Sequence, residues 1–262
     1  QRQWLQSDIL EKQLGYWKNR LAGAPYFLDF PTDFPRPTEQ SFRGCWQSTS
    51  LSQQLSESLR LLSRREGATL FMTLLAAFKA LLWRYTQQDD LLVGAPIAGR
   101  NQIETEPLIG FFINTLVLRT NLAGNPSFRE LLRRVREVTL ESYGNQDLPF
   151  EKLVEVLQPD RSPSYSPLVQ VAFVLQNASN QEVNLPGLSL SRMEATTETA
   201  KFDLTLSIDE LESGLMISME YATDLFEGAT IARLLGYYRN LLEAIAANPA
   251  LHPQMLDVIA QG

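Results

Sequence analysis

Histidine and cysteine are almost missing from this sequence, which contains one residue of each among 262. Because Cys45 is the only cysteine, no internal disulfide can form, and a reducing cytoplasm fits this composition. The sequence also has no paired Cys or Cys/His metal set, no G-x-S-x-G elbow and no phosphate-binding glycine loop. We expect Cys45 to be a small buried side chain in a strand, and His252, in a proline-flanked tail, to be exposed.

Positive charge and long apolar runs are also scarce. Lys and Arg total 23 against 30 Asp and Glu, which gives a net charge of -7. Phosphate binding needs a basic surface, so this balance argues against nucleic acid and against docking on an anionic membrane. The longest apolar run, residues 70–83, is interrupted by Lys79 and is too short to span a bilayer. The first residues show no signal peptide and no initiator methionine, so we expect the chain to be part of a longer protein.

The rest of the sequence is typical of a globular protein, with 44% apolar residues and enough length for one large domain or two small ones. Capping residues and apolar positions at helical spacing predict helices at residues 7–21, 52–66, 69–85, 127–142, 149–157 and 227–247. Apolar or alternating runs predict strands at residues 42–51, 91–93, 111–120, 168–176, 188–194, 201–209 and 215–221. Four prolines make residues 24–38 an extended connector. This order of elements predicts a mixed α/β sandwich in which helices cover a sheet.

The most informative stretch is residues 89–121, in which two apolar strands flank a polar loop at residues 94–100. Alternation in the second strand places Asn114 in an apolar row with Phe112, Leu116 and Leu118. A buried amide must satisfy two donors and one acceptor, so Asn114 needs either backbone partners or a ligand. Gly110 has no side chain and would let a substrate arm or another backbone pass closely.

Other polar residues near this stretch allow two interpretations each. Arg100 could bind a carboxylate or a thioester arm, or it could form a structural ion pair or lie exposed in its loop. Asn145, Gln146 and Asp147 precede a helix that begins at a proline. Asp147 could therefore cap that helix, and Asn145 could lie in a turn. The residue types alone leave these alternatives open.

Several stretches resemble, in the same order, the core motifs of the condensation domains of non-ribosomal peptide synthetases. They are LEKQLGYWKNRLAGAP, ATLFMTLLAAFKALLWRYTQQDDLLVGAPIAGR, IGFFINTLVLR, NQDLPFEKLVEVLQPDRSPSYSPLVQVAFVLQN, KFDLTLSIDE and MEYATDLFEGATIARLLGYYRNLLEAI. The resemblance covers nearly the whole chain and implies a chloramphenicol acetyltransferase-like α/β fold, a two-layer sandwich of a mixed sheet and covering helices. It also implies an amide-forming acyltransferase of secondary metabolite biosynthesis, in which an acceptor amine attacks a donor thioester inside a tunnel between two lobes.

The chain lacks the family's H-H-x-x-x-D-G motif, and every match belongs to the C-terminal lobe. The resemblance therefore implies that residues 1–262 are a C-terminal lobe without a catalytic residue, in which residues 1–38 are a leading helix and Pro-rich connector. A lobe separated from its partner is expected to expose a larger apolar patch than a monomer normally tolerates. The resemblance places six residues at the substrate tunnel or in support of it: Arg100, Gly110, Asn114, Asn145, Gln146 and Asp147.

The same resemblance implies substrates carried on phosphopantetheine arms, with no directly bound cofactor and no metal. The expected partners are the N-terminal lobe of the same domain, donor and acceptor peptidyl carrier proteins, and a neighbouring adenylation domain. Two alternatives stay open. The chain could belong to a heterocyclising or ester-forming acyltransferase of the same superfamily, or it could be a non-catalytic lobe that only binds carrier proteins.

Overall fold

A six-stranded sheet forms the centre of the fold. The computed structural model describes residues 8–99, 108–110, 112–160, 162–176 and 198–252. The strands are β1 (Gly44–Ser52), β2 (Asp90–Ile97), β3 (Asn114–Asn121), β4 (Val171–Gln176), β5 (Leu204–Leu211) and β6 (Gly214–Ala222). Their order across the sheet is β1-β6-β5-β4-β2-β3. β4 runs parallel to β2 and β5, and the other neighbours are antiparallel, so the mixed sheet predicted from the sequence is confirmed.

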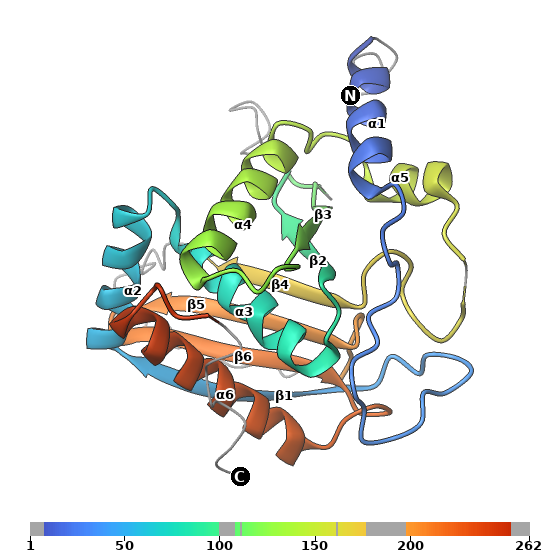
Figure 1. Cartoon of the computed structure of the whole chain (residues 1–262). Coiled ribbons are helices and arrows are strands. Elements are labelled where there is room, and N and C mark those ends of the chain that lie inside the picture. The colour runs from blue at the N-terminus through green and yellow to red at the C-terminus, as the bar shows by residue number, and fades with distance from the viewer. Residues whose placement is uncertain (1–7, 100–107, 111, 161, 177–197, 253–262) are drawn as a thin grey trace, which may run out of the picture.

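Helices form the second layer. They are α1 (Asp8–Leu21), α2 (Gln53–Arg65), α3 (Leu70–Thr86), α4 (Phe128–Tyr143), α5 (Phe150–Leu157) and α6 (Gly228–Ala247). Figure 1 shows α2, α3, α4 and α6 on one side of the sheet, and α1 and α5 beside each other at its β3 end. Among the described residues no single helix is long and apolar enough to cross a membrane, and α2 and α3 meet those criteria only as a pair bent by 103°.

The helix α3 is apolar on all sides because it lies between the sheet and the neighbouring helices. Every residue from 72 to 83 is buried. The Phe78 ring packs against the rings of Phe173 on β4 and Tyr238 on α6. The Tyr238 hydroxyl donates to the Leu74 carbonyl at 2.8 Å, so this buried phenol has a partner. The sequence of this helix is apolar on every side, and each side has a buried contact.

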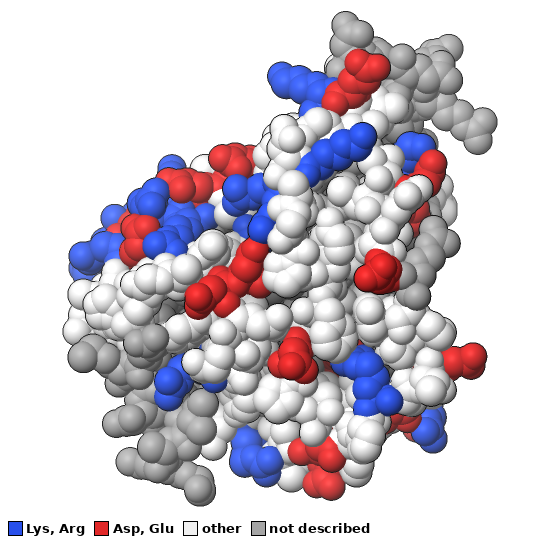
Figure 2. Space-filling view, turned by 45° about the vertical axis from the view of Figure 1, so that its right-hand side comes forward, with Lys and Arg blue, Asp and Glu red and all other residues white. Residues whose placement is uncertain are grey.

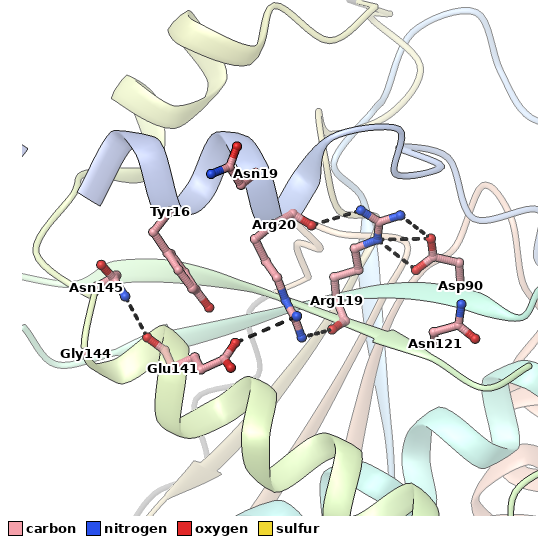
Figure 3. A pocket seen from close by; sticks show the side chains of 9 residues that line it. All are labelled: Tyr16, Asn19, Arg20, Asp90, Arg119, Asn121, Glu141, Gly144 and Asn145. Carbon is pink, nitrogen blue, oxygen red and sulfur yellow. Dashed lines mark hydrogen bonds and ion pairs between the residues drawn. The ribbon is translucent and has the colours of Figure 1, made fainter. Parts of the chain in front are cut away.

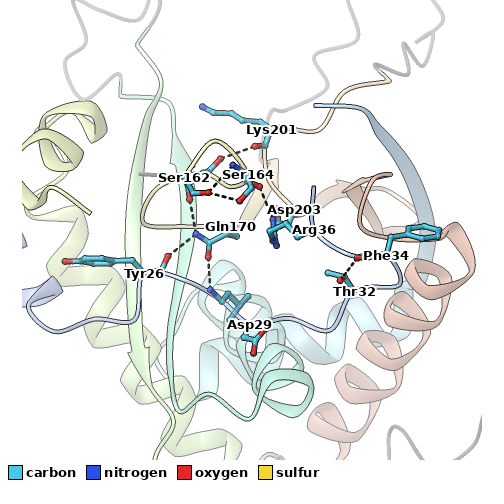
Figure 4. Close-up of polar contacts among 12 residues, drawn as sticks. Tyr26, Asp29, Thr32, Phe34, Arg36, Ser162, Ser164, Gln170, Lys201 and Asp203 are labelled. Carbon is cyan, nitrogen blue, oxygen red and sulfur yellow. Dashed lines mark hydrogen bonds and ion pairs between the residues drawn. The ribbon is translucent and has the colours of Figure 1, made fainter. Parts of the chain in front are cut away.

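The Pro-rich connector is fixed by a side chain from a distant part of the sequence (Figure 4). The Gln170 Oε1 accepts from the Leu28 N–H at 2.8 Å, and its Nε2 donates to the Tyr26 carbonyl at 3.0 Å. Extended backbone cannot satisfy its own hydrogen-bonding groups, so a buried connector needs such partners. The amide of Gln170 therefore binds the connector as a neighbouring strand would.

An ion pair holds the far end of the connector (Figure 4). The Arg36 guanidinium donates two hydrogen bonds to the Asp203 carboxylate, at 3.1 and 2.5 Å. It also lies 5.4 Å from the ring centre of Phe27 and 6.0 Å from that of Tyr165. Burial raises the pKa of the Asp203 carboxyl, and the bonds from Arg36 oppose that rise. The bidentate geometry thus keeps a buried charge paired next to β5.

The central stretch differs from the sequence prediction at both of its strands. β2 continues through the predicted loop to Ile97, so Gly94 and Pro96 lie within it. β2 pairs with β4 at Gly94, and Pro96 lies two residues beyond that pair, where its missing N–H interrupts no described pairing with β4. β3 begins at Asn114 rather than at residue 111. The strand predicted at residues 188–194 lies outside the described residues.

Two predictions about single residues are wrong. Cys45 is exposed because β1, in which it lies, is an edge strand of the sheet. His252 is half-buried, and its Nδ1 lies 2.8 Å from the Asn125 carbonyl oxygen. The preceding residue, Leu251, accepts a hydrogen bond from the Phe128 N–H, so this part of the chain is held against the start of α4.

Candidate functional site

Asn114 joins β3 to the turn that precedes α5. Its Nδ2 donates to the carbonyl oxygens of Gln146 and Leu148, at 2.8 and 2.9 Å. Its Oδ1 accepts from the N–H groups of Thr115 and Phe150, at 2.9 and 3.0 Å. Backbone groups therefore satisfy both donors and the acceptor of this amide, which is the first of the two alternatives that the sequence left open.

Asp147 does not occupy the capping position that the sequence suggested. α5 begins at Phe150, and its N-cap is Pro149, which has no side chain able to accept a bond. The Phe150 N–H is bound by Asn114 instead. The Asp147 Oδ2 accepts from the Gln13 Nε2 of α1 at 3.2 Å. The carboxylate thus connects the turn to α1, and no local pattern indicates this contact because the two residues are 134 positions apart.

Asn145 and Gln146 belong to the same turn. The Asn145 side chain donates to the Glu141 carbonyl at 2.9 Å, and its own carbonyl accepts from the Trp17 Nε1 of α1 at 2.9 Å. Gln146 contributes its carbonyl to Asn114. We call this meeting point of α1, β3 and the turn at residues 144–150 the junction. Four of the six residues singled out from the sequence therefore come together there.

The other two residues are not placed at the junction. Gly110 lies four positions before Asn114 and is exposed, and a Cβ added to it would lie 3.0 Å from the Phe112 ring. The space around Gly110 is therefore limited by its own neighbour in sequence. Arg100 lies outside the described residues. The assignment of all six residues to a substrate tunnel stays a prediction.

A cavity of about 900 Å³ follows the free edge of β3, between α1 and α4 (Figure 3). Arg119 on β3 makes a bidentate ion pair with Asp90 and donates to the carbonyls of Arg20 and Ala22 at the end of α1, both at 2.9 Å. Arg20 in turn donates to the Arg119 carbonyl at 3.3 Å. The two arginines hold α1 against β3. Arg20 also bonds to the carbonyl of Arg119, which would otherwise be unpaired on this edge strand.

Lys79 is fully buried behind the same strand. Its Nζ donates to the Leu118 carbonyl at 2.5 Å and to the Thr120 Oγ1 at 3.0 Å. Burial lowers the pKa of this amine to about 7, against a smaller opposing effect of the Asp90 charge. The lysine therefore connects α3 to β3 through neutral oxygens, in a place where its charged form is disfavoured.

The two faces of the sheet have different coverings. The face beneath α2, α3, α4 and α6 carries the buried side chains of Leu215, Ile217 and Met219. On the opposite face, which we call the second face, the end of α1 covers β3, where it binds Arg119. No described helix lies over the second face of β1, β6, β5 and β4 (Figure 1).

Strand pairing aligns the residues of the second face in three rows. They are Trp46, Glu220, Thr205 and Ala172; Ser48, Ser218, Ser207 and Val174; and Ser50, Met216, Asp209 and Gln176. Burial raises the pKa of the Glu220 carboxyl, and the Thr205 hydroxyl, 3.4 Å away, opposes the rise. The apolar alternation of residues 215–221 predicted the strand, but the sequence analysis did not predict a polar second face. The polar residues that alternate with the apolar ones are the sequence signal for that face.

Several large apolar side chains are exposed in the segments that lead into the junction. They are Ile9 on α1, Leu108, Ile109 and Ile113 before β3, and Leu140 and Tyr143 at the end of α4. Ile113 is 57% exposed although it adjoins Asn114. Exposed apolar side chains gathered near one end of a molecule are typical of a surface that another part of a protein covers.

The face drawn in Figure 2 shows no comparable concentration of charge of one sign among its described residues. In Figure 2 the basic and acidic side chains are interspersed over the visible face, and no large area carries basic side chains alone. On α4, Arg133 pairs with Glu130 and Glu137, and Arg134 pairs with Glu130. Among the described residues no group of His, Cys, Asp and Glu is arranged to hold a metal ion.

The profile of one protein family, described as Condensation domain, matches residues 1–261. The chain belongs to the condensation domain family. A linear gramicidin synthase of Brevibacillus parabrevis is 55% identical over 251 residues, which is 95% of this chain and 3% of that protein. The chain therefore spans a small part of this curated relative, which is a synthase many times longer.

Solved structures agree with this membership. The X-domain from teicoplanin biosynthesis has a TM-score of 0.89 and 31% identity, over 96% of this chain and 57% of that one. A holo four-domain non-ribosomal peptide synthetase bound to AMP and glycine has a TM-score of 0.89 and 26% identity, over 96% of this chain and 20% of that one. The chain thus has the fold of a condensation domain but spans little more than half the length of the X-domain chain.

Proposed function

We propose that the chain is the C-terminal lobe of an amide-forming condensation domain. The observation that carries this proposal is the second face, over which no described helix lies along β1, β6, β5 and β4, on a sheet whose other face is packed by helices. The match to 57% of the X-domain chain leaves room for a second lobe, and the exposed apolar side chains before the junction give that lobe a surface to cover. The second face then becomes one wall of the tunnel between the lobes.

The reaction joins two carrier-bound substrates. The acceptor amine nitrogen forms a bond to the carbonyl carbon of the donor thioester, the carbon–sulfur bond breaks, and the amine proton leaves with the released thiol. The chain contributes no catalytic base to this step, because its only histidine is His252, whose ring lies against the Asn125 carbonyl. The base or positioning histidine belongs to the other lobe in this proposal, and the lobe alone is inactive.

The junction has a supporting role in this proposal. Asn114, with four bonds to backbone, fixes the entry of β3 and the start of α5, and Asp147 and Asn145 fix α1 on the same turn. Arg100 and Gly110 are assigned to the loop that approaches the tunnel. The substrates arrive on phosphopantetheine arms of donor and acceptor carrier proteins in the cytoplasm, and an adenylation domain is a neighbour.

A second candidate is a lobe that binds other proteins and catalyses nothing. One observation favours it: among the similar structures is a complex of the X-domain with OxyB from teicoplanin biosynthesis, with a TM-score of 0.87 and 30% identity. A related domain is thus solved together with a protein partner. Heterocyclising and ester-forming variants share the same fold, and nothing in the described residues favours them.

Reconstitution separates these candidates. The chain is expressed alone and together with the remaining part of its condensation domain, and each sample receives aminoacyl donor and acceptor carrier proteins. Mass spectrometry of the carrier arms should show a dipeptidyl product only when both lobes are present. A product from the chain alone would contradict the assignment of the base to the other lobe. A tight carrier complex with no product from the complete domain would favour the binding lobe, and a heterocycle or ester in place of the amide would favour the variant enzymes.

A further inference from the structure

The second face carries polar side chains for which the described part of the chain supplies no hydrogen-bond partners. Ser207, Ser218 and Asp209 are half-buried, and their side chains form no hydrogen bond with any other described residue. Ser48, next to Ser218 in the same row, is likewise without such a bond to the described part of the chain. Half-buried polar groups lose part of their hydration on folding. Hydrogen bonds from a ligand that replace the lost water therefore contribute favourable binding free energy.

The middle row is built from small hydroxyl side chains on three neighbouring strands. Ser48 pairs with Ser218 and Ser218 pairs with Ser207, so the three hydroxyls lie side by side across β1, β6 and β5. Each hydroxyl can both donate and accept. The amide groups of an extended substrate arm also donate and accept hydrogen bonds. Such an arm fits along this row because the three serine side chains are small.

The charges among the aligned residues of β1, β6, β5 and β4 on this face have one sign. Its twelve aligned residues include two carboxylates, Glu220 and Asp209, and no lysine or arginine. Glu220 already has partners, the Thr205 hydroxyl and the backbone N–H of Lys201. Asp209 has no partner among the described residues, and it lies two positions after Ser207 on the same side of β5. A cationic or hydrogen-donating group is therefore the complement of this face.

We propose that the second face binds the acceptor substrate, with Asp209 receiving the hydrogen bonds of its amine and the serine row receiving the amide groups behind it. This inference rests on the proposed condensation function and assigns the acceptor, rather than the donor, to this wall. The amine is the reacting group of the acceptor, whereas the donor reacts at its thioester carbonyl. A carboxylate that holds an amine in place therefore acts on the acceptor. Asp209 is a positioning residue: it takes no proton permanently and forms no covalent bond.

The test measures binding without turnover. The complete condensation domain, without donor, is titrated with alanyl-pantetheine amide and with propionyl-pantetheine amide, which differ only in the amine. The natural domain should bind the alanyl form about tenfold tighter, as one hydrogen bond to a charged group allows. Asp209→Asn should reduce this ratio to about two, because the neutral amide keeps the shape of the side chain but loses its charge.

Two matched variants complete the test. Glu212→Gln removes a carboxylate from the exposed β5–β6 turn, and it should leave the ratio unchanged. The double variant Ser207→Ala with Ser218→Ala should weaken both ligands by a similar factor of about three and preserve their ratio. An unchanged ratio in Asp209→Asn, or an equal loss in Glu212→Gln, would overturn the assignment to this face.

The outcome is separate from that of the proposed function. If the complete domain forms amide but Asp209→Asn keeps the alanyl preference and the KM for acceptor carrier, the condensation function stands and the second face does not bind the amine. If no amide forms with any carrier pair, the proposed function itself fails. For a positioning residue, Asp209→Asn should raise the KM for the acceptor about tenfold with little change in kcat and none in the donor KM.

Discussion

The two faces of one sheet use their polar residues in opposite ways. On the helix-covered face the buried polar groups find partners within the chain: Lys79 binds two oxygens of β3, and the Ser63 and Thr73 hydroxyls lie 2.7 Å apart. On the second face Ser207, Ser218 and Asp209 have no such partners among the described residues. Folding alone explains the first arrangement, since buried polar groups must be paired. Folding does not require polar side chains without partners on the second face. Their presence there therefore suggests that they bind another molecule.

Neighbouring residues on β4 test this comparison most strongly. Phe173 points to the helices and is fully buried between Phe71 and Phe78, and Val174 points to the second face. Phe173→Ala should lower the free energy of unfolding by about 3–5 kcal/mol, as core truncations do. Val174→Ala should lower it by about 1 kcal/mol or less, because its side chain is only half-buried. Urea titrations measure both, and similar losses would show that the second face is packed as tightly as the first.

Ion pairs extend the comparison to the connector. Arg36→Ala leaves the Asp203 carboxylate buried without a partner and should cost about 3 kcal/mol of stability. Arg43→Ala breaks the pair with Asp224, in which the arginine side chain is 74% exposed, and should cost less than about 1 kcal/mol. Thermal unfolding of the two variants provides the measurement. Equal losses would contradict the view that the connector is held by a buried contact.

The junction should show an intermediate effect. Asn114→Ala leaves two carbonyls and two N–H groups without their side-chain partner and should cost about 2 kcal/mol of stability. Asn145→Ala removes one exposed side-chain bond and should cost about 0.5 kcal/mol. Single-turnover rates of amide formation in the complete domain, measured on both variants, distinguish a residue that supports the fold from one that contacts the substrate. A lost rate in Asn114→Ala with normal melting would make this residue a substrate contact instead.

The last comparison concerns a pH dependence on the covered face. The pKa of Lys79 is lowered from 10.5 to about 7, so the folded chain binds its proton less tightly than the unfolded chain does. Stability should therefore rise as the pH increases from about 7 towards 10.5, where the unfolded chain also loses the proton. Lys79→Met should remove this contribution. The difference in melting temperature between the natural chain and this variant should change between about pH 7 and about pH 9.5, and a constant difference would contradict a lowered pKa.

Much of the fold could be predicted from local sequence. Ser52, Thr69 and Ser127 cap helices as their residue types indicate, each accepting a backbone N–H with its hydroxyl. These interactions join residues three positions apart, so a local pattern contains both partners. Family motifs in the correct order supplied the fold class, because their order and spacing reflect the whole domain rather than any single contact.

The partners of the junction could not be predicted in the same way. The sequence identified Asn114 as an amide that needs partners, yet its bonds to residues 146–150 depend on the approach of segments more than thirty positions apart. For the same reason the sequence suggested Asp147 as a local cap of α5. In the structure the first N–H of α5, that of Phe150, donates to Asn114 instead. A side chain can be recognised as needing a partner from its type, but the choice among distant partners is made by packing.

The sequence by itself determined the helices, most strands, the extended connector and the family, because periodicity, caps and prolines act within a few residues. Only the tertiary structure decided which face of the sheet the described helices leave uncovered along β1, β6, β5 and β4, and which polar residues meet there. Ser207 and Ser218 lie on the two strands of the β5–β6 hairpin, whereas Ser48 lies far from them in the chain and becomes their neighbour through the register of β1 with β6. Register is set by the hydrophobic face that the helices cover, so the polar row on the second face is a consequence of packing on the first.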